Sequence, residues 1–159
     1  MAKNQETLFN IVLVSPEIPG NTGSIGRTCL ALNSRLILIH PLGFDIDEKA
    51  VRRAGLDYWK ELSPTEYQSI DEFFEKENPE RFFLFTKKTS KSLFSENLKM
   101  GDFLIFGPES KGLSEEIILK FKENTLKLPV LNESIRSLNL ASCVTAVLYQ
   151  GYNNIISNS

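Results

Sequence analysis

Short runs of Ile, Leu, Val and Phe recur along this 159-residue chain, separated by segments in which apolar residues repeat at helical spacing. Several runs are continuously apolar rather than alternating, which is typical of parallel strands covered on both faces. The runs predict strands at Leu8–Val14, Arg35–His40, Arg81–Thr86, Asp102–Phe106 and Thr125–Leu128.

Helical patterns lie between and after these strands. They predict helices at Thr22–Asn33, Asp47–Ala54, Ser69–Asn78, the segment after Ser114, and Leu138–Asn154. Ser69 and Glu72 stand at capping-box spacing, and Ser114 can cap a helix whose first turn holds two glutamates. Because strand and helix alternate, we expect an α/β fold with a mostly parallel sheet and helices on both faces. No repeat or linker divides the chain, so we expect a single domain over residues 1–159.

Composition places the chain among ordinary globular proteins, with 42% hydrophobic and 24% charged residues. Cys29 and Cys143 are far apart, which argues against a disulfide or zinc framework and favours two buried free thiols in a reducing compartment. The opening MAKNQETLFN lacks a signal-peptide core, and no apolar run reaches the roughly 20 residues of a membrane span. We therefore expect a cytoplasmic protein that does not contact membranes.

The net charge of −2 and the pI of about 5.5 do not favour a polyanionic partner. Contacts with nucleic acid would have to come from local basic clusters on an acidic surface. Candidates are Arg52–Arg53, Lys87–Lys88 with Lys91, and Arg27 with Arg136. A solvated charged face is the alternative interpretation of each cluster.

Ligands of parallel α/β sheets bind beyond the carboxyl ends of the strands, and three loops there carry candidate chemistry. The first, PEIPGNTGSIGR at residues 16–27, offers Asn21 or Thr22 as a helix cap and backbone N–H groups for an anion. It matches neither a P-loop nor the dinucleotide-binding glycine fingerprint. An ordinary strand-to-helix turn is the alternative.

The second loop, FGPESKGL at residues 106–113, has Gly107 for a close backbone approach and Glu109 as a carboxylate at its mouth. The third begins with LPVLNESIRSLNLA at residues 128–141, and its main-chain groups could encircle an adenine. Ser137 in this loop could instead act only as a helix cap. A structural role is the alternative for both loops.

Taken together and in this order, the three loops resemble those of the SPOUT superfamily of RNA methyltransferases. The similarity is greatest to the small bacterial tRNA (cytidine/uridine) wobble-position ribose 2′-O-methyltransferases. The matching segments are PEIPGNTGSIGR, RRAGLDYW, FGPESKGL and LPVLNESIRSLNLASCVTAVLYQ, so the resemblance covers nearly the whole chain. Departures from the usual pattern are Ser24, Gly26, Leu128 and Val130.

The resemblance implies a C-terminal deep trefoil knot, S-adenosylmethionine as the methyl donor, a homodimer, and the anticodon loop of tRNA as substrate. It assigns Phe85, Gly107, Leu128 and Ser137 to the cofactor, and Arg27 to catalysis from the partner subunit.

Methyl transfer to a ribose 2′-hydroxyl requires in-line positioning and stabilisation of charge on the oxygen, and it needs no metal. We expect Arg27 to orient the phosphate–ribose unit and stabilise a developing alkoxide, because a guanidinium does not readily act as a base. The single histidine, His40, argues against a His-based metal site or triad, and we expect it to be structural.

Weaker candidates for substrate binding are Asn21, Arg136 and Tyr149, and Glu109 is a candidate brace for the loops. Tyr149 could equally belong to the dimer interface or the core. Alternative functions are ribose methylation at another tRNA position or on rRNA, and a non-catalytic RNA- or nucleotide-binding module. A Rossmann-type enzyme would need the glycine fingerprint and the acidic residue that follows it, which the sequence lacks.

Overall fold

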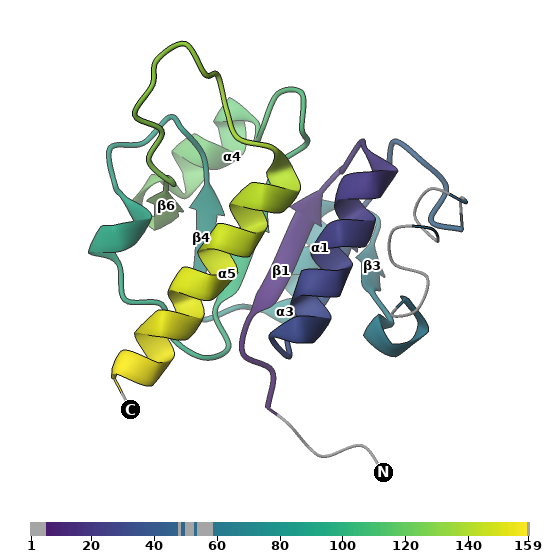
Figure 1. The fold of residues 1–159 in the computed structure, drawn as a ribbon. Coiled ribbons are helices and arrows are strands. Elements are labelled where there is room, and N and C mark those ends of the chain that lie inside the picture. The colour runs from purple at the N-terminus through teal and green to yellow at the C-terminus, as the bar shows by residue number, and fades with distance from the viewer. Residues whose placement is uncertain (1–5, 48, 50–52, 54–58, 159) are drawn as a thin grey trace.

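A computed structural model of the chain describes residues 6–47, 49, 53 and 59–158. Within these residues, six parallel strands form one sheet in the order β3-β2-β1-β5-β4-β6. The strands are β1 (Asn10–Val14), β2 (Arg35–Ile39), β3 (Thr65–Tyr67), β4 (Phe82–Phe85), β5 (Phe103–Phe106) and β6 (Thr125–Leu126). All six point the same way, so their carboxyl ends and the loops that follow lie at one edge of the sheet (Figure 1).

Helices cover both faces of the sheet (Figure 1). Their bounds are α1 (Pro19–Ala31), α3 (Ile70–Glu77), α4 (Glu115–Lys120) and α5 (Leu140–Ser157), with 3₁₀ turns η1 (Leu93–Ser95) and η2 (Lys122–Asn124). Helices α1 and α5 lie side by side on one face, where the hydroxyls of Thr28 and Thr145 are 3.2 Å apart. Helices α3 and α4 pack on the other face. The predicted fold class is therefore confirmed.

Alternating side chains of the central strand β1 pack into two hydrophobic cores, one on each face of the sheet. Ile11 and Leu13 pack with α1 and α5, whereas Val12 packs with α3 and α4. This two-sided burial explains why the strand reads as a continuous apolar run. Gly151 of α5 packs so closely on the Phe9 ring that a Cβ at position 151 would be 2.6 Å from Phe9 Cζ.

The structure corrects several predicted elements. Helix α1 begins at Pro19 rather than Thr22, so Asn21 and Thr22 lie inside the helix instead of capping it. Proline is favoured in the first helical turn because it has no N–H that requires a partner. The short edge strand β3 was missed because its sequence, TEY, has no apolar run. Helix α5 spans Leu140–Ser157, a shift of two to three residues at each end from the prediction.

The caps predicted at Ser69 and Ser114 are confirmed, since their hydroxyls accept the backbone N–H groups of Glu72 and Ile117. Most of the predicted helix at 47–54 and most of the motif RRAGLDYW at 52–59 fall outside the described residues.

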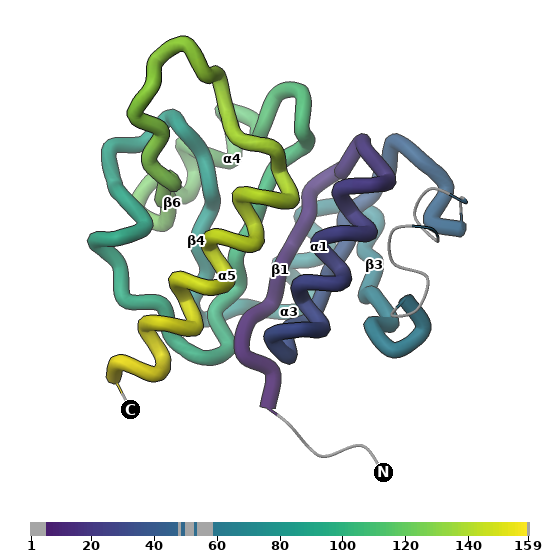
Figure 2. The backbone as a smooth tube through the Cα atoms, viewed as in Figure 1, coloured from purple at the N-terminus to yellow at the C-terminus, as the bar shows by residue number. Residues whose placement is uncertain are grey.

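After β6 at the sheet edge, residues 127–139 arch above the carboxyl ends of the strands and then enter α5, which descends across the sheet (Figure 2). The C-terminal helix thus begins at the edge where the candidate loops gather. The trefoil knot implied by the resemblance stays a prediction. Within the described part of the chain, no helix has the length and apolar character to cross a membrane.

Candidate active site

A cavity of 740 Å³ opens at the carboxyl ends of β4, β5 and β6, between the second and third candidate loops. Of the eight residues predicted from the sequence for catalysis or for cofactor or substrate binding, six line this cavity. They are Asn21, Phe85, Gly107, Leu128, Arg136 and Ser137. The structure thus brings together residues from the three loops and from the end of β4, which are spread over more than 100 positions of the chain.

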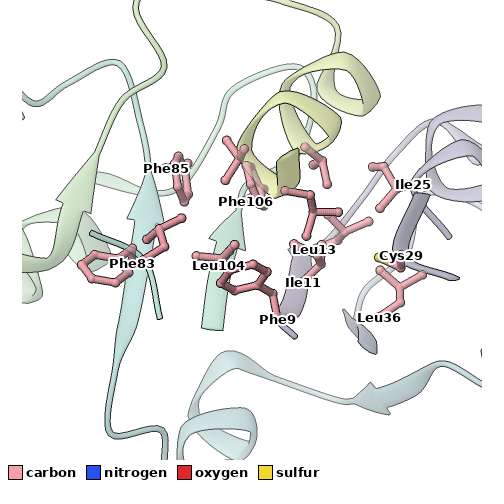
Figure 3. Close-up of a cluster of buried hydrophobic side chains, with 14 of the residues drawn as sticks. Phe9, Ile11, Leu13, Ile25, Cys29, Leu36, Phe83, Phe85, Leu104 and Phe106 are labelled. Carbon is pink, nitrogen blue, oxygen red and sulfur yellow. The ribbon is translucent and has the colours of Figure 1, made fainter. Parts of the chain in front are cut away.

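The floor of the cavity is aromatic. Phe85 and Phe106 end two neighbouring strands, occupy paired positions in the sheet, and stack with ring centroids 4.7 Å apart (Figure 3). Both side chains are buried, with exposed fractions of 8% and 2%. Leu128 and Cys143 extend the apolar wall. Burial raises the pKa of the Cys143 thiol to about 11, so this side chain stays protonated at neutral pH and is a poor nucleophile.

The second loop folds back tightly at Gly107. A Cβ at this position would be 2.3 Å from the backbone nitrogen of Leu113 and 2.4 Å from the carbonyl carbon of Gly112. The Gly112 N–H donates to the Pro108 oxygen at 2.8 Å, and Gly112 itself adopts a φ of +69°. Only glycine at position 107 allows this turn, which forms one wall of the cavity.

Two carboxylates tie the first and second loops together. Glu109 accepts the backbone N–H groups of Glu17 at 2.7 Å and Ile18 at 2.9 Å, so it binds the N–H groups that lead into α1. In return, Glu17 accepts the backbone N–H and hydroxyl of Ser110, at 2.8 and 3.0 Å. These hydrogen bonds lower the pKa of the Glu17 carboxyl. The role of Glu109 as a brace stays a prediction, and this geometry supports it.

The third loop joins the same network through two asparagines. The side-chain amide of Asn21 donates to Glu109 at 3.2 Å and its oxygen accepts the amide of Asn139 at 3.1 Å. Asn139 also caps α5 by accepting the Ser142 N–H at 3.2 Å. The cap is therefore Asn139 and not Ser137, whose place in the cavity lining is consistent with a contact to a ligand.

Substituting Glu109 with glutamine tests this network. We expect Glu109→Gln to lower the free energy of unfolding by about 1–3 kcal/mol, because the new NH₂ group would face N–H donors that the carboxylate now accepts. Urea unfolding at one fixed protein concentration measures the change. The control is Glu116→Gln on the exposed surface of α4. Equal stability of the two variants would show that Glu109 does not hold the loops.

Five cationic side chains line the cavity and form what we call the basic rim: Lys87, Lys88, Lys111, Lys127 and Arg136. The Lys87 ammonium donates to the Arg136 backbone oxygen at 3.2 Å, and Lys88 pairs with Glu115 at 3.2 Å. Lys111 and Lys127 were not identified from the sequence, because each stands alone in its segment. Only the fold gathers them, so the acidic chain carries a positive rim at its candidate site.

Arg27 and Tyr149 do not line this cavity. Arg27 is exposed on α1, and Tyr149 is 51% exposed on α5, so Tyr149 is not a core residue. His40 lies at the end of β2, where its Nε2 is 2.7 Å from the Glu66 carboxylate. Among the described residues, no group of three or more His, Cys, Asp or Glu side chains is placed to hold a metal ion.

The cavity suits a nucleoside-like ligand. Its volume lies within the range of about 300–1,000 Å³ that is usual for small-molecule sites, and it combines apolar walls with a few polar groups. The tight glycine loop and the exposed segment at residues 130–139 offer main-chain donors and acceptors for the edge of a base. S-adenosylmethionine, which joins an adenosine to a cationic amino-acid chain, fits this set of residues.

Solved structures of RNA-modifying methyltransferases share this parallel α/β fold at 38–39% sequence identity, which gives the class of the protein. The model of the SpoU rRNA methylase family matches residues 8–149, and the chain therefore belongs to that family. The membership predicted from the three loops is confirmed.

Curated relatives are similar over nearly their whole length. A tRNA (cytidine(34)-2′-O)-methyltransferase of Saccharophagus degradans is 41% identical, with 93% of this chain and 96% of the relative covered. A protein of the same name from Escherichia coli K12 is 40% identical, with 93% and 94% covered.

Solved structures agree in fold. A structure from work on the 2-OH methylation of C/U34 on tRNA superposes with a TM-score of 0.87 at 39% identity, over 95% of this chain and 97% of that one. The methyltransferase AviRb of Streptomyces viridochromogenes, in complex with AdoMet, has a TM-score of 0.83 at 24% identity. The match covers 96% of this chain and 62% of AviRb, and at this identity it shows a shared fold.

Proposed function

We propose that this protein transfers a methyl group from S-adenosylmethionine to the ribose 2′-hydroxyl of the wobble nucleotide, position 34, of tRNA. The observation that carries the proposal is the convergence of Phe85, Gly107, Leu128 and Ser137 on one cavity. Its support from relatives is about 40% identity, over most of the chain, to proteins named for this reaction.

Within this proposal the four lining residues hold S-adenosylmethionine, which supplies a methyl group already activated by the positive sulfonium. The stacked phenylalanines exclude water from the floor, and the backbone of the Gly107 loop positions the ligand. The Glu109–Asn21–Asn139 network holds the three loops in fixed positions relative to one another. Precise alignment of two reactants supplies much of the rate enhancement for a transfer of this kind.

Arg27 completes the site from a second copy of the chain. It lies on α1, outside the cavity of its own subunit, and its planar guanidinium offers several N–H donors. We infer that its guanidinium orients the ribose–phosphate unit and stabilises negative charge as the 2′-oxygen loses its proton. The proton passes to phosphate or solvent.

A homodimer is part of this proposal. Tyr149, Tyr152 and Ile156 are 51%, 39% and 52% exposed, and their spacing puts them on one face of α5, beside α1. A second copy on this face would cover an apolar surface and bring its Arg27 toward the cavity. Tyr149 then belongs to the interface rather than to an RNA-binding surface.

The basic rim supports a single-stranded RNA loop as the substrate. Phosphates attract lysine and arginine at any sequence, and local positive charge matters more than the net charge of −2. Arg136 on the rim would contact phosphate, and the anticodon loop is the part of tRNA that contains the wobble nucleotide.

We also propose that the chain has the knotted topology and that the protein is located in the cytoplasm, where tRNA is modified.

Methyl transfer to tRNA from a strain that lacks this protein tests the proposal. We expect label from S-adenosylmethionine to enter the ribose of nucleotide 34, as located by nuclease digestion and mass spectrometry. Label at another tRNA position or in rRNA would overturn the assignment of the substrate. Binding of S-adenosylmethionine and RNA without any transfer would point to a non-catalytic module.

A further inference from the structure

A second cavity, of 590 Å³, lies on the other side of the Gly107–Leu113 loop from the first. The two cavities share a wall made by Pro108, Gly112 and Leu113, together with the side chains of Lys88 and Lys111. The second cavity also touches the ends of β1 and β2 and the beginnings of α3 and α4. Neither the family match nor the resemblance assigns it a ligand.

Its lining combines apolar side chains with hydroxyl groups. Val14, Leu42, Ile70, Leu113 and Ile117 supply the apolar surface. Hydroxyl groups come from Ser15 and Ser114. A flat group with apolar faces and a hydrogen-bonding edge fits this combination, which is the description of a nucleobase.

The charged groups of the second cavity are two lysines and two glutamates. Glu115 faces Lys88 across 3.2 Å, but the two side chains are 81% and 49% exposed, so the pair is weak and a phosphate can displace it. Glu17 is held by the backbone N–H and hydroxyl of Ser110. Lys88 and Lys111 therefore present positive charge along the ridge between the cavities.

We propose that the second cavity binds the base of the nucleotide next to the one that is methylated, with the connecting phosphate on the ridge of Lys88 and Lys111. The proposal rests on the function proposed above, because it needs an RNA strand whose ribose enters the first cavity. The shared ridge between the two cavities carries the inference. The same two lysines line both cavities, which is where the phosphate that joins two adjacent nucleotides would lie.

RNA with one base removed tests the proposal directly. The substrates are an anticodon stem-loop and two versions of it, abasic at the nucleotide before or after the target. We expect one abasic version to raise the KM for RNA about 10-fold in the wild-type protein, because burial of one base against the aliphatic side chains of the cavity contributes on that order. The other version should change KM much less.

Filling the second cavity should remove the same interaction. Ile70→Trp puts a large ring at a half-buried position that lines only the second cavity, at the start of α3. We expect it to raise the KM for intact RNA about 10-fold, and the sensitive abasic RNA should then cause no further rise. The matched control is Glu75→Trp, at an exposed position of the same helix.

Thermal unfolding and the affinity for S-adenosylmethionine check that Ile70→Trp leaves the fold and the first cavity intact. Equal KM values for all three RNAs in the wild-type protein would overturn the proposal, as would additive effects of Ile70→Trp and the abasic site. Failure of the intact stem-loop and of whole tRNA to accept a methyl group would instead overturn the proposed function. The two failures are thus distinguishable.

Discussion

Replacing Gly107 with alanine is expected to weaken the binding of S-adenosylmethionine on the order of 100-fold, because binding groups must be held within about 0.5 Å of their productive positions and the loop would have to move farther than that. The added Cβ would stand 2.3 Å from the Leu113 nitrogen and 2.4 Å from the Gly112 carbonyl carbon. Both neighbours are backbone atoms, so the whole loop has to move rather than one side chain. Isothermal titration calorimetry with S-adenosylmethionine measures the loss.

The control for this variant is Gly20→Ala in the first turn of α1, where an added Cβ meets no atom within 4 Å. Alanine is also the better helix former, so this variant should fold and bind as the wild type does. A thermal unfolding scan of Gly107→Ala separates lost binding from lost folding. Wild-type affinity in Gly107→Ala would show that the loop at residues 107–113 does not form the cofactor site.

The strands of the sheet centre could be predicted from sequence because burial on both faces leaves a continuous apolar run, as in Phe103–Phe106. The edge strand β3 could not, since it makes only one strand pairing and its middle residue, Glu66, is exposed. The start of α1 was misplaced for a different reason. Its N-cap residue, Ile18, has no side-chain cap, and the N–H groups of Glu17 and Ile18 just before the helix are bound by Glu109 from a distant loop, so no local capping residue marks the boundary.

The cofactor side of the site could be predicted through the order of three loop motifs, and Phe85, Gly107 and Ser137 do meet at one cavity. Periodicity alone would not have found it, because each loop by itself reads as an ordinary strand-to-helix turn. Lys111 and Lys127 could not be predicted as part of the site, because isolated lysines are common on protein surfaces. The second cavity likewise depends on contacts between elements far apart in sequence.

Arg27→Ala is expected to reduce kcat on the order of 100-fold or more while leaving the affinity for S-adenosylmethionine unchanged, because removing one donor to a developing oxyanion has effects of this size. We expect kcat to fall without a change in cofactor affinity because Arg27 does not line the cavity of its own subunit. Arg27→Lys keeps the charge but loses the planar fork of donors. A near wild-type kcat in Arg27→Lys would contradict bidentate contact with the substrate.

Mixing two inactive proteins tests whether Arg27 acts across the dimer. In a heterodimer of Arg27→Ala and Gly107→Ala subunits, one composite site has an intact cavity from the first subunit and an intact Arg27 from the second. Random exchange of subunits makes half of the dimers mixed, so about a quarter of the wild-type activity should return. Differently tagged subunits, purified over both tags, confirm that mixed dimers are present. If those dimers stay inactive, Arg27 serves the cavity of its own subunit, and the partner has no catalytic part.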